Sequence, residues 1–415
     1  MVMKRHYGWV VCTAGTLLLI CTLGATSNAF VAYLPFIKAE GYSGAQVSSI
    51  LSARCLFSLI GMLCVEPYYR TLNLRTGLTL SCLLSAAGFA AYAFASYIWM
   101  YYLPAMLCGF AYGFGSLISI SILIRRWFVD KRAFAIGICV SGTGIATICF
   151  PPVITLLVEK YGLSNAFLIE AVFLVACAGV IGLLLRNDPA ELGLKPYGAE
   201  AESESAIKSL TPVPSGENLN KQLLLPMLGA MVLLGATGTS GPGHFSVLLT
   251  TSGYSAMLAS SAVSVFGISL TLSKLSYGLI SDRIGGCKSA LLFFTVLALG
   301  CLSCSLIDGK SMIPVFMGVI LMGLGYPPAT VGISVWAADF SDEANYAKTL
   351  KWFQVSYSLG GMIFVSAPGL LYDLTGGYQV AYFAFLCTIP LIALVIWRTY
   401  HVRAGKEKLG AAQLF

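Results

Sequence analysis

Long apolar segments alternate with short polar segments along nearly the whole chain. This pattern predicts twelve membrane-spanning helices, at residues 8–36, 44–66, 76–96, 99–124, 132–158, 163–185, 223–251, 255–281, 287–307, 311–337, 346–371 and 377–398. Each segment is about 20 residues long or longer, which is the length that an α-helix needs to cross a bilayer. The alternation of ten-residue strands that is typical of a membrane β-barrel is not seen. We therefore predict an all-α membrane protein.

One long polar stretch interrupts this pattern, at residues 186–222. It is rich in Glu, Ser, Pro and Gly, a composition typical of a flexible linker. The prediction is an N-terminal six-helix bundle at 1–185, a cytoplasmic linker at 186–222 and a C-terminal six-helix bundle with a short cytoplasmic tail at 223–415.

The composition supports a membrane protein and excludes several other classes. Only 10% of the residues are charged and the mean hydropathy is +0.82, whereas soluble domains carry about 25% charged residues. The 13 cysteines lie almost entirely in apolar segments, without the spacing of a metal site in any loop, so we expect packing roles and no metal or cofactor. The first apolar segment is too long for a signal peptide.

The positive charges predict the orientation in the membrane. Most of the 25 Lys and Arg residues fall at the two termini and in the even-numbered loops, and only Lys38, Lys160 and Lys310 fall in the odd-numbered loops. By the positive-inside rule, both termini are cytoplasmic, and we expect a multi-pass protein of the cell membrane. The net charge of +7 thus reflects topology, and we expect no nucleic-acid partner.

A motif between predicted helices 8 and 9 carries the strongest resemblance. Its sequence is GLISDRIGGCK, with Gly278, Asp282, Arg283 and Gly285 at the key positions. It resembles the loop signature of the major facilitator superfamily, which implies contacts that hold one conformation of the transporter. Gly278 permits close helix approach, and Gly285 permits a tight turn. The matching loop after helix 2 begins at Gly61 and is degenerate. Weak similarity between helices 5 and 11, in 141–162 and 358–376, agrees with a duplicated six-helix unit.

A second signature narrows the resemblance. The segment WFVDKRAFAIG at 127–137 opens helix 5, and Tyr7-Gly8-Trp9 opens helix 1. Together they resemble the branch of monocarboxylate transporters and oxalate/formate antiporters, which implies twelve helices in two bundles, transport by alternating access and no cofactor. We also expect a monomer. The chain departs from that branch at Leu270, where proton-coupled members tend to carry an Asp, and at 352–354, where oxalate exchangers carry a Lys.

Two cations fall inside the apolar segments. Lys274 lies about 12 Å into the membrane from Asp282, and Arg54 lies about 18 Å in from Glu66, at 1.5 Å per residue. A charge at such depth costs at least about 2.5 kcal/mol. We expect no carboxylate at comparable depth, because Glu170 is assigned to the outer part of helix 6. This favours an anion arriving from outside the protein, bound by Lys274 and assisted by Arg54; a structural role for Arg54 remains equally open.

Further candidates are polar and aromatic residues on helices that line the cavity in the resembled superfamily. These are Asn28, Tyr33, Tyr112, Tyr326, Thr330, Gln354 and Tyr357. Together they suggest a partly apolar pocket with hydroxyl donors, suited to a carboxylate with a hydrophobic body. His244 is a candidate for coupling a proton, although a lone helical His is more often a packing residue.

The functional prediction is a secondary active transporter that moves a small organic anion across the bilayer, with a proton or a counter-anion as a possible partner. The alternative is an exporter of amphipathic or drug-like compounds, for which we would expect acidic residues in the site. A sensor would carry a large soluble domain, and an enzyme would need a catalytic constellation that His6, His244 and His401 are too dispersed to provide. We expect no enzymatic activity and no channel.

Overall fold

The computed structural model describes residues 6–42, 44–199, 221–342, 345–365 and 367–412, and these residues form helices and short connections without a β-strand. They divide into two compact units, unit 1 at Met1–Pro212 and unit 2 at Val213–Phe415. The predicted all-α membrane fold is confirmed. Within the described residues, ten segments are long and apolar enough to cross a membrane, and α3 with α4 forms one more, bent by 58°.

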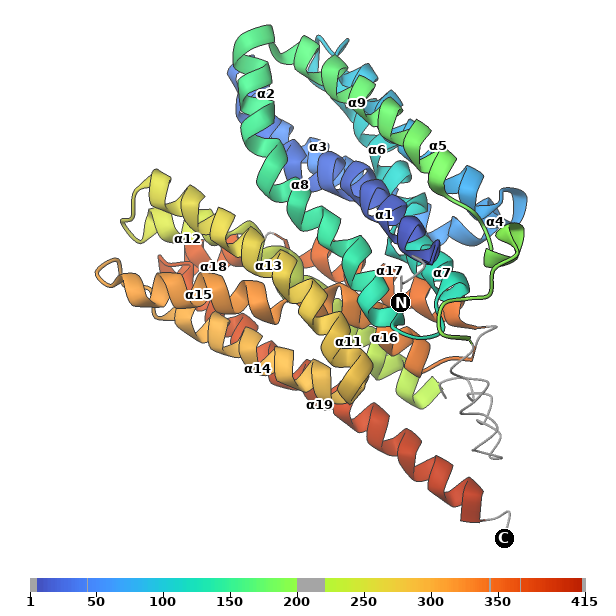
Figure 1. Cartoon of the computed structure of the whole chain (residues 1–415). Helices are drawn as coiled ribbons and strands as arrows, with labels where there is room; N and C mark the ends of the chain where they lie inside the picture. Colours follow the sequence, from blue (N-terminus) through green and yellow to red (C-terminus); the bar gives the residue numbers. More distant parts are fainter. Residues whose placement is uncertain (1–5, 43, 200–220, 343–344, 366, 413–415) are drawn as a thin grey trace, which may run out of the picture. The chain divides into compact units, whose positions relative to one another are not determined.

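Unit 1 contains the first six predicted spans (Figure 1). Its elements are α1 (Gly8–Leu19), the π-helix η1 (Ile20–Ala29), η2 (Phe30–Tyr33), α2 (Leu34–Ala39), α3 (Gly44–Leu63), α4 (Val65–Thr71), α5 (Leu74–Tyr92), η3 (Ile98–Tyr101), α6 (Tyr102–Phe114), α7 (Leu117–Trp127), α8 (Arg132–Tyr161), α9 (Leu163–Leu184) and η4 (Pro189–Leu192).

Unit 2 contains the other six predicted spans. Its elements are α11 (Lys221–Gly243), α12 (Phe245–Thr251), α13 (Ala256–Ile284), α14 (Gly286–Ser305), α15 (Met312–Gly325), η5 (Pro327–Ala329), α16 (Val331–Asp339), α17 (Tyr346–Phe364), α18 (Ala367–Thr375) and α19 (Gln379–Ala412). The helix α19 packs along α14 and continues beyond it (Figure 1).

The first, fourth, seventh and tenth spans are not continuous α-helices. The first turns into the π-helix η1 and then into η2, and the fourth breaks between α6 and α7. The seventh breaks at His244, and the tenth breaks at η5, which contains Pro327 and Pro328. A proline removes a backbone donor and clashes with the preceding turn. Broken helices at membrane depth are a common feature of binding sites in transporters, because they free backbone groups to contact a ligand.

Glycines allow the closest helix crossings in each unit. In unit 1, a Cβ at Gly109 of α6 would lie 2.5 Å from the carbonyl oxygen of Arg54 on α3. In unit 2, a Cβ at Gly235 of α11 would overlap the carbonyl of Tyr357 on α17, and one at Gly360 would overlap the carbonyl of Val232. Small residues let membrane helices approach until backbone meets backbone, which is a main source of their packing energy.

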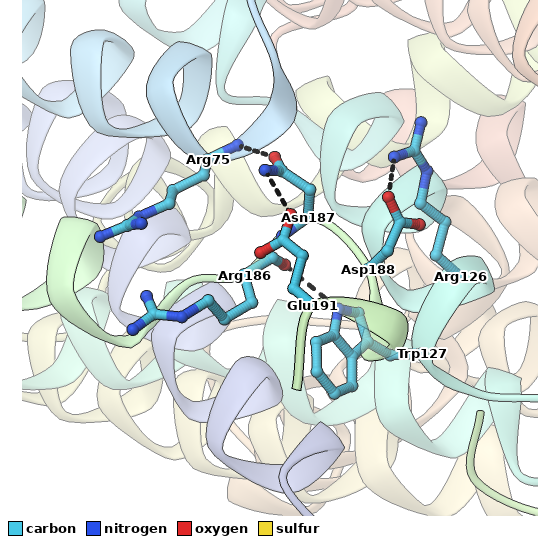
Figure 2. Close-up of polar contacts among 7 residues, drawn as sticks. All are labelled: Arg75, Arg126, Trp127, Arg186, Asn187, Asp188 and Glu191. Atoms are coloured by element: carbon cyan, nitrogen blue, oxygen red, sulfur yellow. Dashed lines mark hydrogen bonds and ion pairs between the residues drawn. The ribbon is translucent and has the colours of Figure 1, made fainter. Parts of the chain in front are cut away.

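The first part of the predicted linker packs against unit 1 instead of forming a flexible tether. Asn187 accepts a hydrogen bond from the backbone N–H of Arg75 at 2.8 Å and donates to Glu191 at 2.9 Å (Figure 2). Asp188 forms an ion pair with Arg126 at 3.1 Å. Composition alone suggested flexibility, but these side chains find partners at the ends of α5 and α7. The remainder of the predicted linker, residues 200–220, lies outside the described part of the chain.

Aromatic contacts continue this packing as far as Tyr197. Its backbone bonds to Trp127 and Val129, and its ring lies 5.6 Å from Trp9 and 5.5 Å from Phe128. The buried Trp127 also donates its indole N–H to the carbonyl oxygen of Arg186 (Figure 2). The two sequence signatures at 7–9 and 127–137 therefore meet in one cluster, which the sequence did not indicate.

Candidate functional site

Lys274 is buried in the middle of α13, with 2% of its surface exposed. The hydroxyl of the preceding residue, Ser273, donates to the carbonyl oxygen of Gly323 on α15 at 2.9 Å. One turn further along α13, the buried Tyr277 lies against Gly332 on α16. Along α13, Lys274 lies between these two contacts. Along the tenth span, the break between α15 and α16 lies between the same two contacts. The position of the lysine on α13 is therefore level with the broken part of the tenth span.

Two of the sequence-predicted tyrosines come together at this break. The hydroxyls of Tyr326 and Tyr357 are 3.3 Å apart, and Tyr326 also donates to the carbonyl oxygen of Gly238 on α11. Thr330, at the other end of the break, donates to the carbonyl oxygen of Pro327 at 3.2 Å. Two spans of unit 2 thus bring hydroxyl groups to one place, and a third span contributes the carbonyl oxygen of Gly238. A pair of hydroxyls can both donate and accept hydrogen bonds, as a carboxylate or hydroxy acid requires.

Gln354 lies one turn before Tyr357 on α17 and has only 4% of its surface exposed. Its side-chain carbonyl oxygen is buried and, among the described residues, has no hydrogen-bond partner. Leaving a buried polar atom unbonded costs about 1–3 kcal/mol, so such an atom calls for an explanation.

Sequence reasoning missed Lys351, which lies three residues before Gln354 and has 9% of its surface exposed. Its ammonium lies 5.6 Å from the ring centre of Trp352. The sequence comparison considered residues 352–354, which carry no charge. The buried ammonium of Lys351 lies immediately before them on the same helix. The helical spacing of Lys351 and Gln354 was the available signal.

His244 occupies the break in the seventh span and is partly exposed. Its Nδ1 is 2.9 Å from the carbonyl oxygen of Ser240, and its ring stacks on Tyr378 at 5.8 Å. These contacts fix the ring in place, and they agree with the packing role that a lone helical histidine more often has.

Arg54 is the buried cation of unit 1, with 8% of its surface exposed. Its Nη2 contacts the sulfur of Cys55 at 3.3 Å. Its Nε and Nη1 are buried and have no hydrogen-bond partner among the described residues. The guanidinium therefore keeps two donors available at the level where α3 crosses α6.

Glu170 is the buried carboxylate of unit 1 among its described residues. Glu170 on α9 has 5% of its surface exposed and accepts a hydrogen bond from Tyr33 at 2.6 Å. The assignment of Glu170 to the outer part of the sixth span stays a prediction.

The remaining candidates in unit 1 are separate from these two residues. Asn28 is exposed in the π-helix η1 and donates to the hydroxyl of Thr147 on α8 at 3.0 Å. Tyr112 is partly exposed, one turn before the break in the fourth span. No contact described in the structure joins either residue to Arg54.

The motif loop of unit 2 has the geometry that its glycines predict. Gly285 ends α13 with φ of +86° and donates its N–H to the carbonyl oxygen of Ser281. Gly278 is buried, whereas Asp282 and Arg283 are exposed. A positive φ is readily adopted only by glycine, which accounts for Gly285 at this position.

The family model of the Major Facilitator Superfamily matches residues 15–257 and 227–414. Together these matches include all but the ends of the chain. The chain therefore belongs to the Major Facilitator Superfamily.

Curated relatives place the chain near the monocarboxylate transporters. Monocarboxylate transporter 12 of the mouse is 24% identical over 301 residues, covering 67% of this chain and 61% of the relative. Monocarboxylate transporter 13 of cattle is 23% identical over 386 residues, covering 91% and 85%. The rat transporter 12 is 29% identical over 199 residues, covering 47% of this chain and 39% of the relative. The match thus spans less than two thirds of the transporter 12 relatives.

Solved structures share the fold at low identity. The proton:xylose symporter XylE has a TM-score of 0.72 at 12% identity, covering 94% of this chain and 95% of the other. The human organic anion transporter MFSD10 has a TM-score of 0.64 at 15% identity, covering 94% and 97%. These likenesses concern the fold alone.

Proposed function

We propose that the protein is a secondary active transporter that moves a small organic anion, a carboxylate, by alternating access, and that Lys274 binds the negative charge. The observation that carries the proposal is the burial of Lys274 in the middle of α13. An ammonium at membrane depth is costly, and such residues commonly mark the path of a substrate or an ion.

The surroundings of the lysine support an anion that also accepts hydrogen bonds. Tyr326 and Tyr357 meet at the broken part of the tenth span, at the level of Lys274. The side-chain carbonyl oxygen of Gln354 is buried without a described partner and, as an acceptor, suits a hydroxyl group on the ligand. A ligand held by one cation and several neutral donors fits a carboxylate better than a cationic drug. The names of the relatives, monocarboxylate transporters 12 and 13, agree with this substrate class.

In this proposal the protein binds and moves its substrate without covalent chemistry. Lys274 supplies a point charge and not the bidentate fork of an arginine, so it constrains the direction of the carboxylate less. The hydroxyls of Tyr326 and Tyr357 then fix its orientation. Arg54 stays a second candidate for binding an anion, within unit 1.

Thermal stabilisation by a panel of mono- and dicarboxylates tests the proposal. Purified wild type, Lys274→Gln and Lys288→Gln are compared; Lys288 is exposed in the same unit and its replacement removes the same charge. A ligand at a hundred times its Kd stabilises a protein by about 2.7 kcal/mol. We expect stabilisation of wild type and Lys288→Gln and its loss in Lys274→Gln. Stabilisation only by neutral or cationic amphipathic compounds would contradict the carboxylate and favour drug export.

A further inference from the structure

A cavity at the surface of unit 1 fits a ligand other than the transported substrate. It has a volume of about 310 Å³ and lies between α5 and α9, which pack against each other. Its lining residues are Arg75, Thr76, Thr79, Leu80, Leu83 and Gly182. We propose that it binds an anionic phospholipid, with the phosphate at Arg75 and Arg186 and an acyl chain along the leucines. Such a site does not depend on the proposed function.

Two arginines bring positive charge to one end of the cavity. The Nε of Arg75 donates to the carbonyl oxygen of Gly182 at 2.8 Å, and Nη1 of Arg186 donates to the carbonyl oxygens of Leu183 and Leu185, each at 2.9 Å. Both guanidinium groups are thus anchored at the end of α9, and they extend to the same side of the view in Figure 2. A guanidinium held in place in this way offers its remaining N–H groups as a fork that matches phosphate oxygens.

The carboxylates nearby in the chain do not neutralise these two arginines. Asp188 pairs with Arg126 at 3.1 Å, and Glu191 accepts a hydrogen bond from a side-chain amide at 2.9 Å. Figure 2 shows the Arg126–Asp188 pair on the opposite side of the view from the guanidinium groups of Arg75 and Arg186. Within the described part of the chain, neither of these two arginines forms an ion pair. This end of the cavity therefore favours an anionic ligand.

The apolar wall of the cavity favours a lipid over a soluble phosphate. Leu80 and Leu83 are 46% and 38% exposed. They follow Arg75 by about 7.5 Å and about 12 Å along α5, at 1.5 Å per residue. The polar layer on each side of a bilayer is about 5–8 Å thick. An arginine at the level of the phosphates therefore places the two leucines at the level of the acyl chains.

Small polar residues complete the cavity between the arginine and the leucines. Thr76 is exposed, and its hydroxyl can donate to a phosphate oxygen. Gly182 lies beside Thr79, where an added Cβ would be 3.3 Å from the threonine side chain, so a larger residue would narrow the cavity. The end of unit 1 that holds Arg75 is also the end that the positive charges predict to be cytoplasmic, and the cytoplasmic leaflet carries the anionic lipids.

Mass spectrometry of the purified full chain under non-denaturing conditions tests the preference for an anionic headgroup. Dioleoylphosphatidylglycerol and dioleoylphosphatidylcholine, which share their acyl chains and differ in net charge, are added in equal amounts. The first lipid bound to wild type should be the anionic one, by a factor of about five or more. The double variant Arg75→Gln/Arg186→Gln should bind the two lipids about equally. Arg70→Gln removes an exposed arginine of α4 and should keep the preference. A preference that persists in the double variant would overturn the assignment.

Thermal unfolding distinguishes the phospholipid from a free phosphate and leaves both arginines in place. Dioleoylphosphatidylglycerol should stabilise wild type, whereas sn-glycerol 3-phosphate, which has the phosphate ester without acyl chains, should not. Thr76→Trp puts a large ring into the cavity and should weaken the apparent affinity for the lipid about tenfold. Thr71→Trp, the same change at an exposed position of α4, should leave the affinity as in wild type. Equal stabilisation by sn-glycerol 3-phosphate, or unchanged lipid affinity in Thr76→Trp, would contradict the proposal.

Discussion

The two units bury their charges in different ways. Unit 1 buries one cation, Arg54, and one carboxylate, Glu170, and no ion pair between them is described. Unit 2 buries two lysines, Lys274 and Lys351, and among its described residues no Asp or Glu is buried to the same degree. Arg54 and Lys274 occupy related helices of the two halves, so the difference lies in what surrounds them. An excess of buried positive charge, as in unit 2, suits the capture of an anion.

The same comparison extends to backbone packing, where the largest effects are expected. Gly235→Val places atoms where α17 already touches α11, and overpacking at such a backbone contact should destabilise unit 2 by about 3 kcal/mol or more. Gly109→Val should have a comparable effect in unit 1. The control is Gly229→Ala on α11, where no atom lies within 4 Å. Thermal unfolding of the three purified variants checks the prediction, and a stable Gly235→Val would show that the helices separate easily at this crossing.

Replacement of the buried Gln354 should raise the stability of the ligand-free protein and lower its affinity for the ligand. Gln354→Met removes an unbonded polar atom, so the ligand-free protein should become more stable by about 1 kcal/mol. For a carboxylate ligand that also carries a hydroxyl group, the same change should weaken binding about fivefold, because the amide oxygen can accept a hydrogen bond from that hydroxyl and such a bond is worth about 1 kcal/mol. Unfolding temperatures measured with and without ligand separate the two effects. Loss of stability together with unchanged affinity would assign Gln354 a structural role.

Polar contacts at the ends of the two units provide a smaller contrast. In unit 2, Tyr400 donates to the half-buried Asp339, and Tyr400→Phe should cost about 1–2 kcal/mol. In unit 1, the Arg126–Asp188 pair has side chains 44% and 48% exposed, and a double-mutant cycle should give a coupling below about 0.5 kcal/mol. Denaturation of each variant provides both values. A larger coupling for the exposed pair would mean that it holds residues 186–192 in place.

The smallest expected effect is on the acid dependence of unfolding, through Asp308 in the loop between α14 and α15. The backbone N–H groups of Lys310 and Ser311 donate to Asp308 and hold the pKa of its carboxyl below the ordinary value. A depressed folded-state pKa contributes stability above the unfolded-state pKa, and this contribution is lost as the pH falls through the folded-state pKa. Asp308→Asn should therefore make unfolding slightly less sensitive to acid. An unchanged acid dependence would show that the loop opens before the rest of unit 2 unfolds.

The helical spans could be predicted from hydropathy because the bilayer imposes a length and forbids unsatisfied backbone groups. The breaks were only partly foreseeable. Pro327 and Pro328 signalled the interruption of the tenth span, but the π-helix at Ile20–Ala29 carries no comparable signal. It depends on contacts with other helices, such as the close approach of Gly24 to Ala146.

Candidate residues could be named from the sequence in both units, but the contacts among them could not. Lys274 stood out because a charge in an apolar segment is rare, and Tyr326 and Tyr357 followed from the family resemblance. The contact between those two hydroxyls, and the partnership of Glu170 with Tyr33, depend on helix rotation and stagger. Neither property is fixed by hydropathy. The docking of residues 186–199 was missed because composition describes the average behaviour of such segments and not the partners available to them.

Counterflow in proteoliposomes tests the central proposal most directly, with a labelled carboxylate chosen from the stabilisation panel. Wild type and Lys288→Gln should accumulate the label when the vesicles contain the same unlabelled carboxylate, and Lys274→Gln should accumulate no more than empty vesicles. Accumulation by Lys274→Gln at the rate of wild type would contradict the assignment of the buried lysine as the anion-binding group.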